Sequence, residues 1–346
     1  MINKIYIEGF KSINKLEIEC KPFNLLAGTN SSGKSSLIQA LLLMAQNLDN
    51  HYGLNGPLVA VGEFREIKNY NINLNHILVK IQDDRECVSL SFKEDESPLV
   101  NGAGTELAKR ISYSSNQIHY LSCNRIGSQD IYKKNRTTNS GVGTNGEYAI
   151  DYLCQNKDTP LDDNILKDKS NYTLLAQTNF WLQYIVGANI KAEEVIGTDV
   201  VKASYGMIEG RYSRPQNVGS GISYLISIIV MCLGSKAGDF LIIENPEIHL
   251  HPLSQSKLCD FLYFISRAER QLIIETHSDH IFNAARVGIA TNTMDSNRMA
   301  LNFFKLGSDN CTRNYVIQIG EYGKIKNPIP NMFDQFEVDL DRMIGV

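Results

Sequence analysis

A glycine- and serine-rich stretch near the N-terminus, GTNSSGKSSL from Gly28 to Leu37, restricts the possible folds more than any other part of the chain. It follows the apolar run FNLLAG and continues into SSLIQALLLMAQNL, so the sequence predicts a buried strand, a tight loop and an amphipathic helix in this order. Gly28, Gly33, Lys34 and Ser35 satisfy the pattern G-x-x-x-x-G-K-[ST]. In such a loop the backbone N–H groups and the helix N-terminus converge on phosphate oxygens.

The residue types of this loop point to a nucleoside triphosphate. Lys34 is expected to reach the β- and γ-phosphates, and the Ser35 hydroxyl is expected to bind Mg²⁺. The alternative is a chance match in a polar turn. The order of strand, loop and helix argues against that alternative, because the pattern has its meaning only in this context.

Composition and charge exclude several classes of protein. With 346 residues, of which 43% are hydrophobic and 21% charged, the chain resembles an ordinary globular protein. The net charge of −4 gives no general argument for binding nucleic acid or an anionic membrane, although a local basic patch around Ile131–Arg136 stays open. No stretch approaches the roughly 20 apolar residues that cross a bilayer. The seven scattered cysteines predict free thiols, and the N-terminus lacks a signal-peptide pattern, so we expect a cytoplasmic protein without a membrane partner.

The order of predicted elements indicates an α/β fold. KIYIEGF with KLEIEC and HILVKIQ with CVSLSF read as antiparallel pairs, and 124–147 reads as a long mobile loop. Helical spacing dominates from about residue 147 to 187, and DVVKASYGMIEGRY reads as a hairpin that turns near SYG. From residue 219 onward, helices alternate with the apolar strands FLIIE and QLIIE, which is typical of a parallel sheet.

Two later stretches supply polar residues at strand ends, and a third opens a helix. Glu244 ends FLIIE, where it is placed to hold Mg²⁺ beside the loop serine. Thr276, His277 and Ser278 follow QLIIE and are expected at the same edge of the sheet. Gly219, Ser220 and Gly221 begin a helix whose N–H groups could meet a phosphate.

Together these motifs resemble ABC-type ATPases of the SMC/RecF-like kind, and especially the stand-alone prokaryotic members with an ENPEIHLHP-like motif. GFKS, the phosphate loop, GSG, ENPE and THS occur here in the order of that family. The tail from Ile329 to Ile344 is similar to a short C-terminal domain of unknown function. The resemblance implies one ATPase head, 1–346, with an antiparallel β subdomain and a small helical insertion. Its expected parts are an N-terminal β and phosphate-loop lobe at 1–146 and a helical insertion at 147–200. A lobe at 201–306 is expected to carry the signature, Walker B and switch motifs, and a final strand and helix are expected at 307–346.

The resemblance also implies roles for individual residues. Glu244 takes the place of the Walker B acid, with Ser35 as the other Mg²⁺ ligand, and His277 matches the histidine that contacts the γ-phosphate. The signature loop, which closes over the nucleotide of the opposite subunit, matches Gly219, Ser220 and Gly221. The ATP phosphates are expected to contact Asn30, Ser31, Ser32, Gly33, Lys34, Ser35 and Ser36.

One departure from the family concerns the general base. The family has Asp-Glu before Pro, whereas this chain has Glu244-Asn245. Asn245 can orient a water but cannot accept its proton. The candidates for the catalytic role are therefore Glu247, Asn245 and His277, or a residue from a neighbour, and slow turnover is the other possibility. Gln129 is a candidate for the Mg²⁺-sensing glutamine, and Gln46 fits a structural role better.

Two other readings of the sequence are less favoured. The first is a metal centre built from four histidines and one aspartate. The spacing of these residues fits no common zinc pattern: His249, His251, His277, Asp279 and His280. The DLDR stretch near the C-terminus is not expected to be a nuclease site, because its apolar neighbours look like the buried face of a helix: Phe333, Phe336, Val338, Leu340 and Met343.

The resemblance implies an ATP-binding and hydrolysing protein that dimerises around Mg²⁺ and nucleotide. It implies a homodimer or higher homo-oligomer and an effector partner, a nuclease or toxin, in prokaryotic defence against foreign DNA. A RecF-like DNA-repair ATPase that binds nucleic acid is the alternative, and the ATPase subunit of a membrane transporter is a third.

Overall fold

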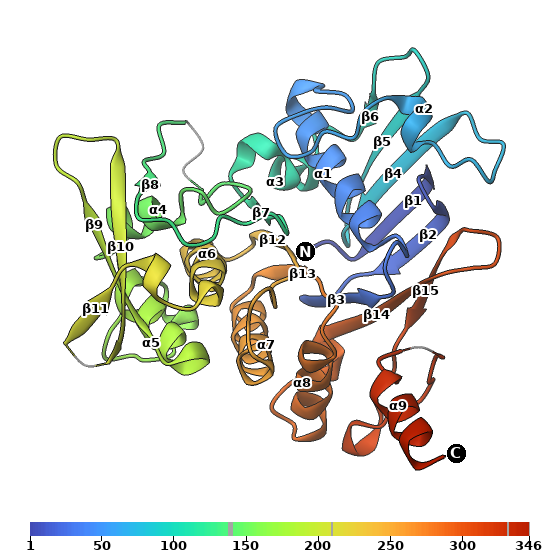
Figure 1. Cartoon of the computed structure of the whole chain (residues 1–346). Helices are drawn as coiled ribbons and strands as arrows, with labels where there is room; N and C mark the ends of the chain where they lie inside the picture. Colours follow the sequence, from blue (N-terminus) through green and yellow to red (C-terminus); the bar gives the residue numbers. More distant parts are fainter. Residues whose placement is uncertain (138–140, 209, 331, 346) are drawn as a thin grey trace.

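The computed structural model describes residues 1–137, 141–208, 210–330 and 332–345. Within them the strands form three sheets (Figure 1). The central one has the order β15-β14-β3-β13-β12-β7, and its strands are parallel except for β15 at the edge. Their bounds are β3 Phe23–Gly28, β7 Ile118–Leu121, β12 Phe240–Glu244, β13 Gln271–Glu275, β14 Met299–Leu306 and β15 Thr312–Val316. The predicted parallel α/β sheet is therefore confirmed.

Both faces of the central sheet are covered, which explains why its strands are apolar without alternation. Leu241 and Ile243 point into a core shared with one set of helices, whereas Ile242 points into a second core shared with α1 and the N-terminal sheet. Figure 1 shows the two sets on opposite sides of the sheet. The helices of the first set are α6 Ser220–Gly234, α7 Pro252–Arg267 and α8 Asp279–Ala290, and those of the second are α1 Lys34–Asn50 and α3 Glu106–Ile111.

The N-terminal sheet is antiparallel, in the order β2-β1-β4-β5-β6. Both hairpins expected from the alternating pattern are confirmed by the pairing of β1 with β2 and of β4 with β5. The short helix α2 (Phe64–Ile67) follows α1 in the chain. The strands are β1 Lys4–Phe10, β2 Ile13–Glu19, β4 His76–Gln82, β5 Cys87–Lys93 and β6 Leu99–Asn101.

A smaller sheet and two helices fill the middle of the chain. The predicted helical region contains α4 (Ala149–Asn156) and α5 (Leu174–Val186). The sheet consists of β8 Tyr132–Lys133, β9 Asn189–Glu194, β10 Val200–Ile208 and β11 Arg211–Ser213. The predicted long loop 124–147 contains β8 and includes residues 138–140, which lie outside the described residues.

The hairpin of β10 and β11 exists, but the predicted position of its turn is wrong. β10 continues through Tyr205 and Gly206, and the chain reverses only after Ile208. Tyr205 is fully buried in the core, and a Cβ on Gly206 would approach the ring of Tyr212 to 3.2 Å. The glycine at this position therefore makes room for a cross-strand aromatic side chain and does not form a turn.

The C-terminal helix α9 (Gln335–Ile344) corrects another expectation. Phe333 does pack against the rings of Phe282 and Phe303. In contrast, Phe336 is 72% exposed, and Val338, Leu340 and Met343 are exposed as well. The pattern for an amphipathic helix was read correctly, but α9 lies at the periphery of the molecule, where its apolar face has no cover from the described part of the chain (Figure 1).

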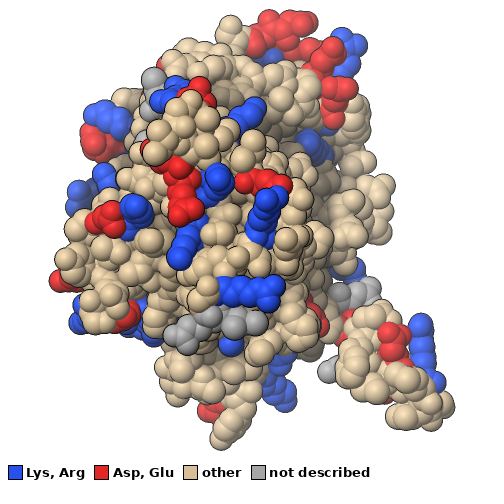
Figure 2. All heavy atoms as spheres, turned by 60° about the vertical axis from the view of Figure 1, so that its left-hand side comes forward, with Lys and Arg blue, Asp and Glu red and all other residues tan. Residues whose placement is uncertain are grey.

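Charges of both signs are interspersed on the face that carries β9, β10 and β11 (Figure 2). In the stretch for which a basic patch was left open, Arg136 pairs with Asp199 at 2.6 Å and Lys134 pairs with Glu194 at 3.5 Å. Part of the positive charge in this stretch is therefore neutralised by neighbouring acids. None of the helices in the described ranges combines the length and the apolar character that crossing a membrane requires.

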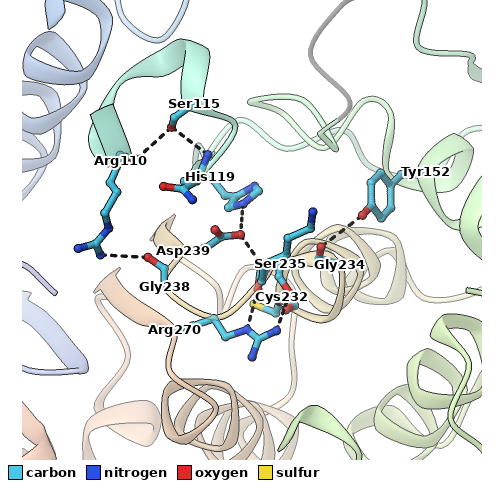
Figure 3. A network of polar contacts seen from close by, with 12 residues as sticks. Arg110, Ser115, His119, Tyr152, Cys232, Gly234, Ser235, Gly238, Asp239 and Arg270 are labelled. Carbon is cyan, nitrogen blue, oxygen red and sulfur yellow. Dashed lines mark hydrogen bonds and ion pairs between the residues drawn. The ribbon is translucent and has the colours of Figure 1, made fainter. Parts of the chain in front are cut away.

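A polar network joins α3, β7 and the turn before β12 near the amino ends of these two strands (Figure 3). His119 Nε2 lies 2.8 Å from Asp239 Oδ2, and Arg110 donates to the carbonyl oxygen of Gly238 at 3.3 Å. Asp239 comes just before β12, so this network lies at the edge of the sheet opposite to the carboxyl ends of the strands. We interpret it as a structural contact that holds these elements together.

Candidate functional site

The loop after β3 has the backbone shape that its glycines predict. Gly28 has a φ of 146°, and a Cβ there would lie 2.2 Å from the carbonyl oxygen of Phe304 on β14. Gly33 has a φ of 103°, and its Cβ would meet the Thr312 hydroxyl at 2.2 Å. Since neither position has room for a side chain, both glycines are required by the packing of the loop against β14 and β15.

Lys34 is the first residue of α1 and folds back over the loop. Its Nζ donates to the carbonyl oxygens of Gly28 at 3.0 Å and Thr29 at 2.8 Å. Burial lowers the pKa of the Lys34 ammonium, and the carboxylates of Glu275 and Glu247 oppose that shift. The ammonium is thus held beside the loop by hydrogen bonds to two carbonyl oxygens. A phosphate oxygen could take the place of either carbonyl as the acceptor.

Ser35 contacts an acid that the sequence analysis did not single out. Its Oγ donates to Oε1 of Glu275 at 2.8 Å. Glu275 ends β13 and is only 3% exposed, and its Oε2 has no hydrogen-bond partner among the described residues. Burial raises the pKa of this carboxyl to about 7, with Ser35 opposing the shift and Glu244 adding to it. One signal in the sequence could have pointed to Glu275: the apolar strands FLIIE and QLIIE both end in Glu. In the structure these two glutamates, Glu244 and Glu275, are paired in register.

Glu244 lies one strand farther from the loop and faces the segment after β7. Its Oε2 accepts a bond from the backbone N–H of Cys123 at 3.0 Å. The pKa values of Tyr120 and Cys123 are raised mainly by burial, and the Glu244 carboxylate raises them further. Nearby, the buried guanidinium of Arg125 donates to the backbone carbonyl of Glu244 at 2.5 Å. The Glu244 carboxylate is therefore engaged on the β7 side.

The residues after Glu244 form a constrained turn. Asn245 has a φ of 43°, and its backbone N–H donates to the carbonyl of Glu275 at 2.8 Å. Its side-chain oxygen is buried without a hydrogen-bond partner among the described residues. Arg125 also donates to the Asn245 carbonyl, at 2.5 Å. Asparagine tolerates the left-handed region better than most residues, which fits its presence here.

Glu247 connects this turn to the loop after β13. Its Oε2 accepts from the Thr276 hydroxyl at 2.9 Å and its Oε1 from the backbone N–H of His277 at 2.8 Å. Burial raises the pKa of Glu247, and its bonds to the loop oppose that rise. The His277 side chain is partly exposed, and the burial of its remaining part, together with the Lys34 charge, lowers its pKa. Glu247 therefore fixes the backbone of the loop that carries His277.

These elements enclose a cavity of about 370 Å³ at the carboxyl ends of β3 and β13. All the residues predicted to contact phosphates line it, together with His277 and the unpredicted Glu275. Glu244, Asn245 and Glu247 are not among its lining residues. The lining consists of Lys11, Ser12, Asn30, Ser31, Ser32, Gly33, Lys34, Ser35, Ser36, Glu275 and His277.

The cavity suits an anion together with a divalent cation. Lys34 and the start of α1 favour phosphate oxygens. The Ser35 hydroxyl and the free oxygen of Glu275 are hard oxygen donors of the kind that Mg²⁺ prefers, so the residues fit this ion. In the described ranges no group of three or more His, Cys, Asp or Glu could hold a metal by itself. His251 instead caps α7, and His249 packs against the ring of Tyr224.

The other predicted residues lie outside the cavity. Gly219 and Ser220 are exposed at the N-terminus of α6, whereas Gly221 is buried, and a Cβ on it would lie 2.4 Å from the His249 carbonyl oxygen. Gln129 is exposed. Gln46 is buried, and its amide bonds to the backbone of Gly53 and Val59, as expected for a structural residue.

The family model described as "AAA ATPase domain" matches the chain in two overlapping stretches, 1–203 and 155–282. No curated protein matches the sequence.

Among solved structures, the chain is similar to an SMC head bound to the C-winged helix domain of ScpA, with a TM-score of 0.59, 15% identity, and coverage of 91% of this chain and 97% of that one. It is also similar to an SMC head with an extended coiled coil bound to the C-terminal domain of ScpA derived from Pyrococcus furiosus, with a TM-score of 0.58, 13% identity and 99% coverage of both chains. An SMC head domain from Thermotoga maritima gives a TM-score of 0.50 at 13% identity, with coverage of 92% and 99%. At these identities the likeness concerns the fold.

Proposed function

Because this chain belongs to the AAA ATPase domain family and has the fold of SMC heads, we propose that it binds ATP with Mg²⁺ in the cavity at Asn30–Ser36 and hydrolyses it slowly. The observation that carries the proposal is this cavity, where the phosphate loop, Glu275 and His277 meet at one edge of the central sheet. Ligands of open α/β sheets bind at the carboxyl ends of the strands.

Each group has a role that follows from its position. Lys34 and the N–H groups at the start of α1 would hold the β- and γ-phosphates, and His277 lines the same cavity for a contact with the terminal phosphate. Mg²⁺, when bound, would neutralise phosphate charge, with Ser35 and a neighbouring carboxylate as its protein ligands. Phosphoryl transfer needs mainly positioning and charge stabilisation, which this arrangement is suited to supply.

The slow turnover that we propose rests on the two residues that follow Glu244 where the family has its general base, Asn245 and Glu247. Asn245 has no proton-accepting group of the required basicity. Both carboxylate oxygens of Glu247 already accept bonds from the Thr276–His277 loop. Glu247 remains the candidate base, with Asn245 orienting the water and His277 at the terminal phosphate.

We further propose that two copies dimerise head to tail around ATP. Support comes from the start of α6, where Gly219 and Ser220 are exposed and offer N–H groups and a hydroxyl to a ligand outside their own chain. The cycle would then drive or restrain an effector protein, a nuclease or toxin, in defence against foreign DNA. The related SMC head structures are described as bound to a domain of a second protein, ScpA, and the effector role itself comes from the family resemblance alone.

The test of ATP binding is Lys34→Ala, measured by calorimetry. We expect ATP affinity to fall about 100-fold or more, which corresponds to about 2.8 kcal/mol, because charge-assisted bonds to phosphate are lost. The fold should persist, since the bonds of Nζ within the described residues go to two carbonyls of its own loop. Lys202→Ala, at an exposed position on β10, is the control. Equal ATP affinity in Lys34→Ala and Lys202→Ala would falsify the assignment of the site.

A further inference from the structure

The acid closest to the phosphate-loop serine lies on β13, although the sequence pointed to β12. In the central sheet β13 lies between β3, which carries the loop, and β12. Glu275 ends β13, is paired in register with Leu26 of β3, and accepts the bond from Ser35. Glu244 occupies the same level one strand farther away.

The two acids differ in what they contact. Glu244 accepts from the Cys123 N–H on the side of β7 and does not line the phosphate-loop cavity. Glu275 lines the cavity and uses one oxygen for Ser35. Its other oxygen is buried and has no hydrogen-bond partner in the described part of the chain. A buried carboxylate oxygen without a partner is costly, so it indicates a ligand at this position.

The bond between Ser35 and Glu275 also orients the hydroxyl. A hydroxyl has one proton and two lone pairs. With its proton directed at Glu275, the lone pairs of Ser35 Oγ remain available to a cation. A hydroxyl oxygen and a carboxylate that is already bonded to it form the start of an oxygen-ligand set for Mg²⁺, which is commonly held by one or two carboxylates, waters and phosphates.

We propose that Glu275, together with Ser35, supplies the carboxylate for the Mg²⁺ of the bound nucleotide, in the place that the sequence pattern gives to Glu244. The inference rests on the proposed ATP function and makes it more specific. Glu244 then has a supporting role, in which it fixes the loop after β7 beside the site.

The test compares the isosteric variants Glu275→Gln and Glu244→Gln by calorimetric ATP titration, once with Mg²⁺ and once with EDTA. Binding of Mn²⁺ in the presence of ATP, followed by electron paramagnetic resonance, gives a readout independent of turnover. Mg²⁺ should raise the ATP affinity of Glu275→Gln by a factor about tenfold or more smaller than in the wild type. This is the size of effect typical of groups that hold or orient a metal. The ATP affinity of Glu275→Gln in EDTA should not decrease, because a buried negative charge near phosphate has been removed. Glu193→Gln, on the exposed face of β9, controls for the loss of a carboxylate elsewhere.

The outcomes separate this inference from the function on which it rests. If the wild-type protein binds no ATP, the proposed function fails and the inference fails with it. If the wild type binds ATP more tightly with Mg²⁺ and Glu275→Gln keeps that gain while Glu244→Gln loses it, only the inference fails. Should Glu275→Gln not fold, Glu275→Asp and Glu244→Asp replace the pair, and a larger loss of metal-dependent affinity is expected in Glu275→Asp. An equal or smaller loss there overturns the inference.

Discussion

At the scale of single residues, the site is built from bonds that join distant parts of the chain. Ser35 bonds to Glu275, and Thr276 and His277 bond to Glu247. The types of these residues were visible in the sequence, and the phosphate-loop residues were predicted individually. The contact of Glu275 with Ser35 was not predicted, because it depends on β13 lying next to β3, and nothing local in either strand specifies that neighbour.

Glu247 offers a direct test of the chemistry. If it is the general base, Glu247→Gln should lower turnover at saturating ATP by about tenfold or more and leave ATP affinity nearly unchanged, because a base acts on the attacking water and not on the bound ground state. A phosphate-release assay on folded, ATP-saturated protein measures this. The competing role is purely positional, through Thr276 and His277. In that case the variant melts at a lower temperature, while turnover per folded molecule equals that of the wild type.

At the scale of elements, the sequence was most informative where burial sets the pattern. The apolar strands β12 and β13 and the antiparallel pairs β1–β2 and β4–β5 were predicted correctly, because their periodicity follows from which faces are covered. The turn assigned to SYG was wrong, because a glycine under an aromatic ring looks the same in sequence as a glycine in a turn. For α9, periodicity identified the apolar face but could not say what lies against it.

Arg270 is expected to hold several elements together. Its guanidinium is 1% exposed and donates to the carbonyls of Ser235 after α6 at 2.6 Å and of Ala268 after α7. Burial lowers its pKa, and the Asp162 carboxylate opposes this shift. Arg270→Met should reduce the free energy of unfolding by about 3 kcal/mol, because buried carbonyls lose their donors.

Denaturant unfolding of Arg270→Met checks this expectation. Arg267→Met, at an exposed position in the last turn of α7, is the matched control and should change the free energy of unfolding by less than about 0.5 kcal/mol. Equal unfolding midpoints for the two variants would show that the Arg270 contacts contribute nothing to stability.

At the scale of the whole molecule, the phosphate-loop cavity and the start of α6 are separate features of one chain. The cavity is lined by residues of the phosphate loop, β13 and the segments next to them, and Gly219, Ser220 and Gly221 are not among those residues. A helix that begins at an exposed Gly-Ser pair has unpaired N–H groups to offer. If these groups serve a nucleotide, the described arrangement suggests that they serve one held by another copy.

Ser220→Arg tests this arrangement, because a long cation at the start of α6 would obstruct a closely packed interface. We expect ATP binding by the monomer to stay within about twofold of wild type, since Ser220 does not line the cavity of its own chain. Dimerisation with a non-hydrolysable ATP analogue, followed by light scattering, should be abolished. Ser97→Arg, at an exposed position between β5 and β6, introduces the same side chain away from α6 and should dimerise normally. An ATP-induced dimer of unchanged stability in Ser220→Arg would contradict a site shared between two chains, and the function of α6 would then have to be sought within a single copy.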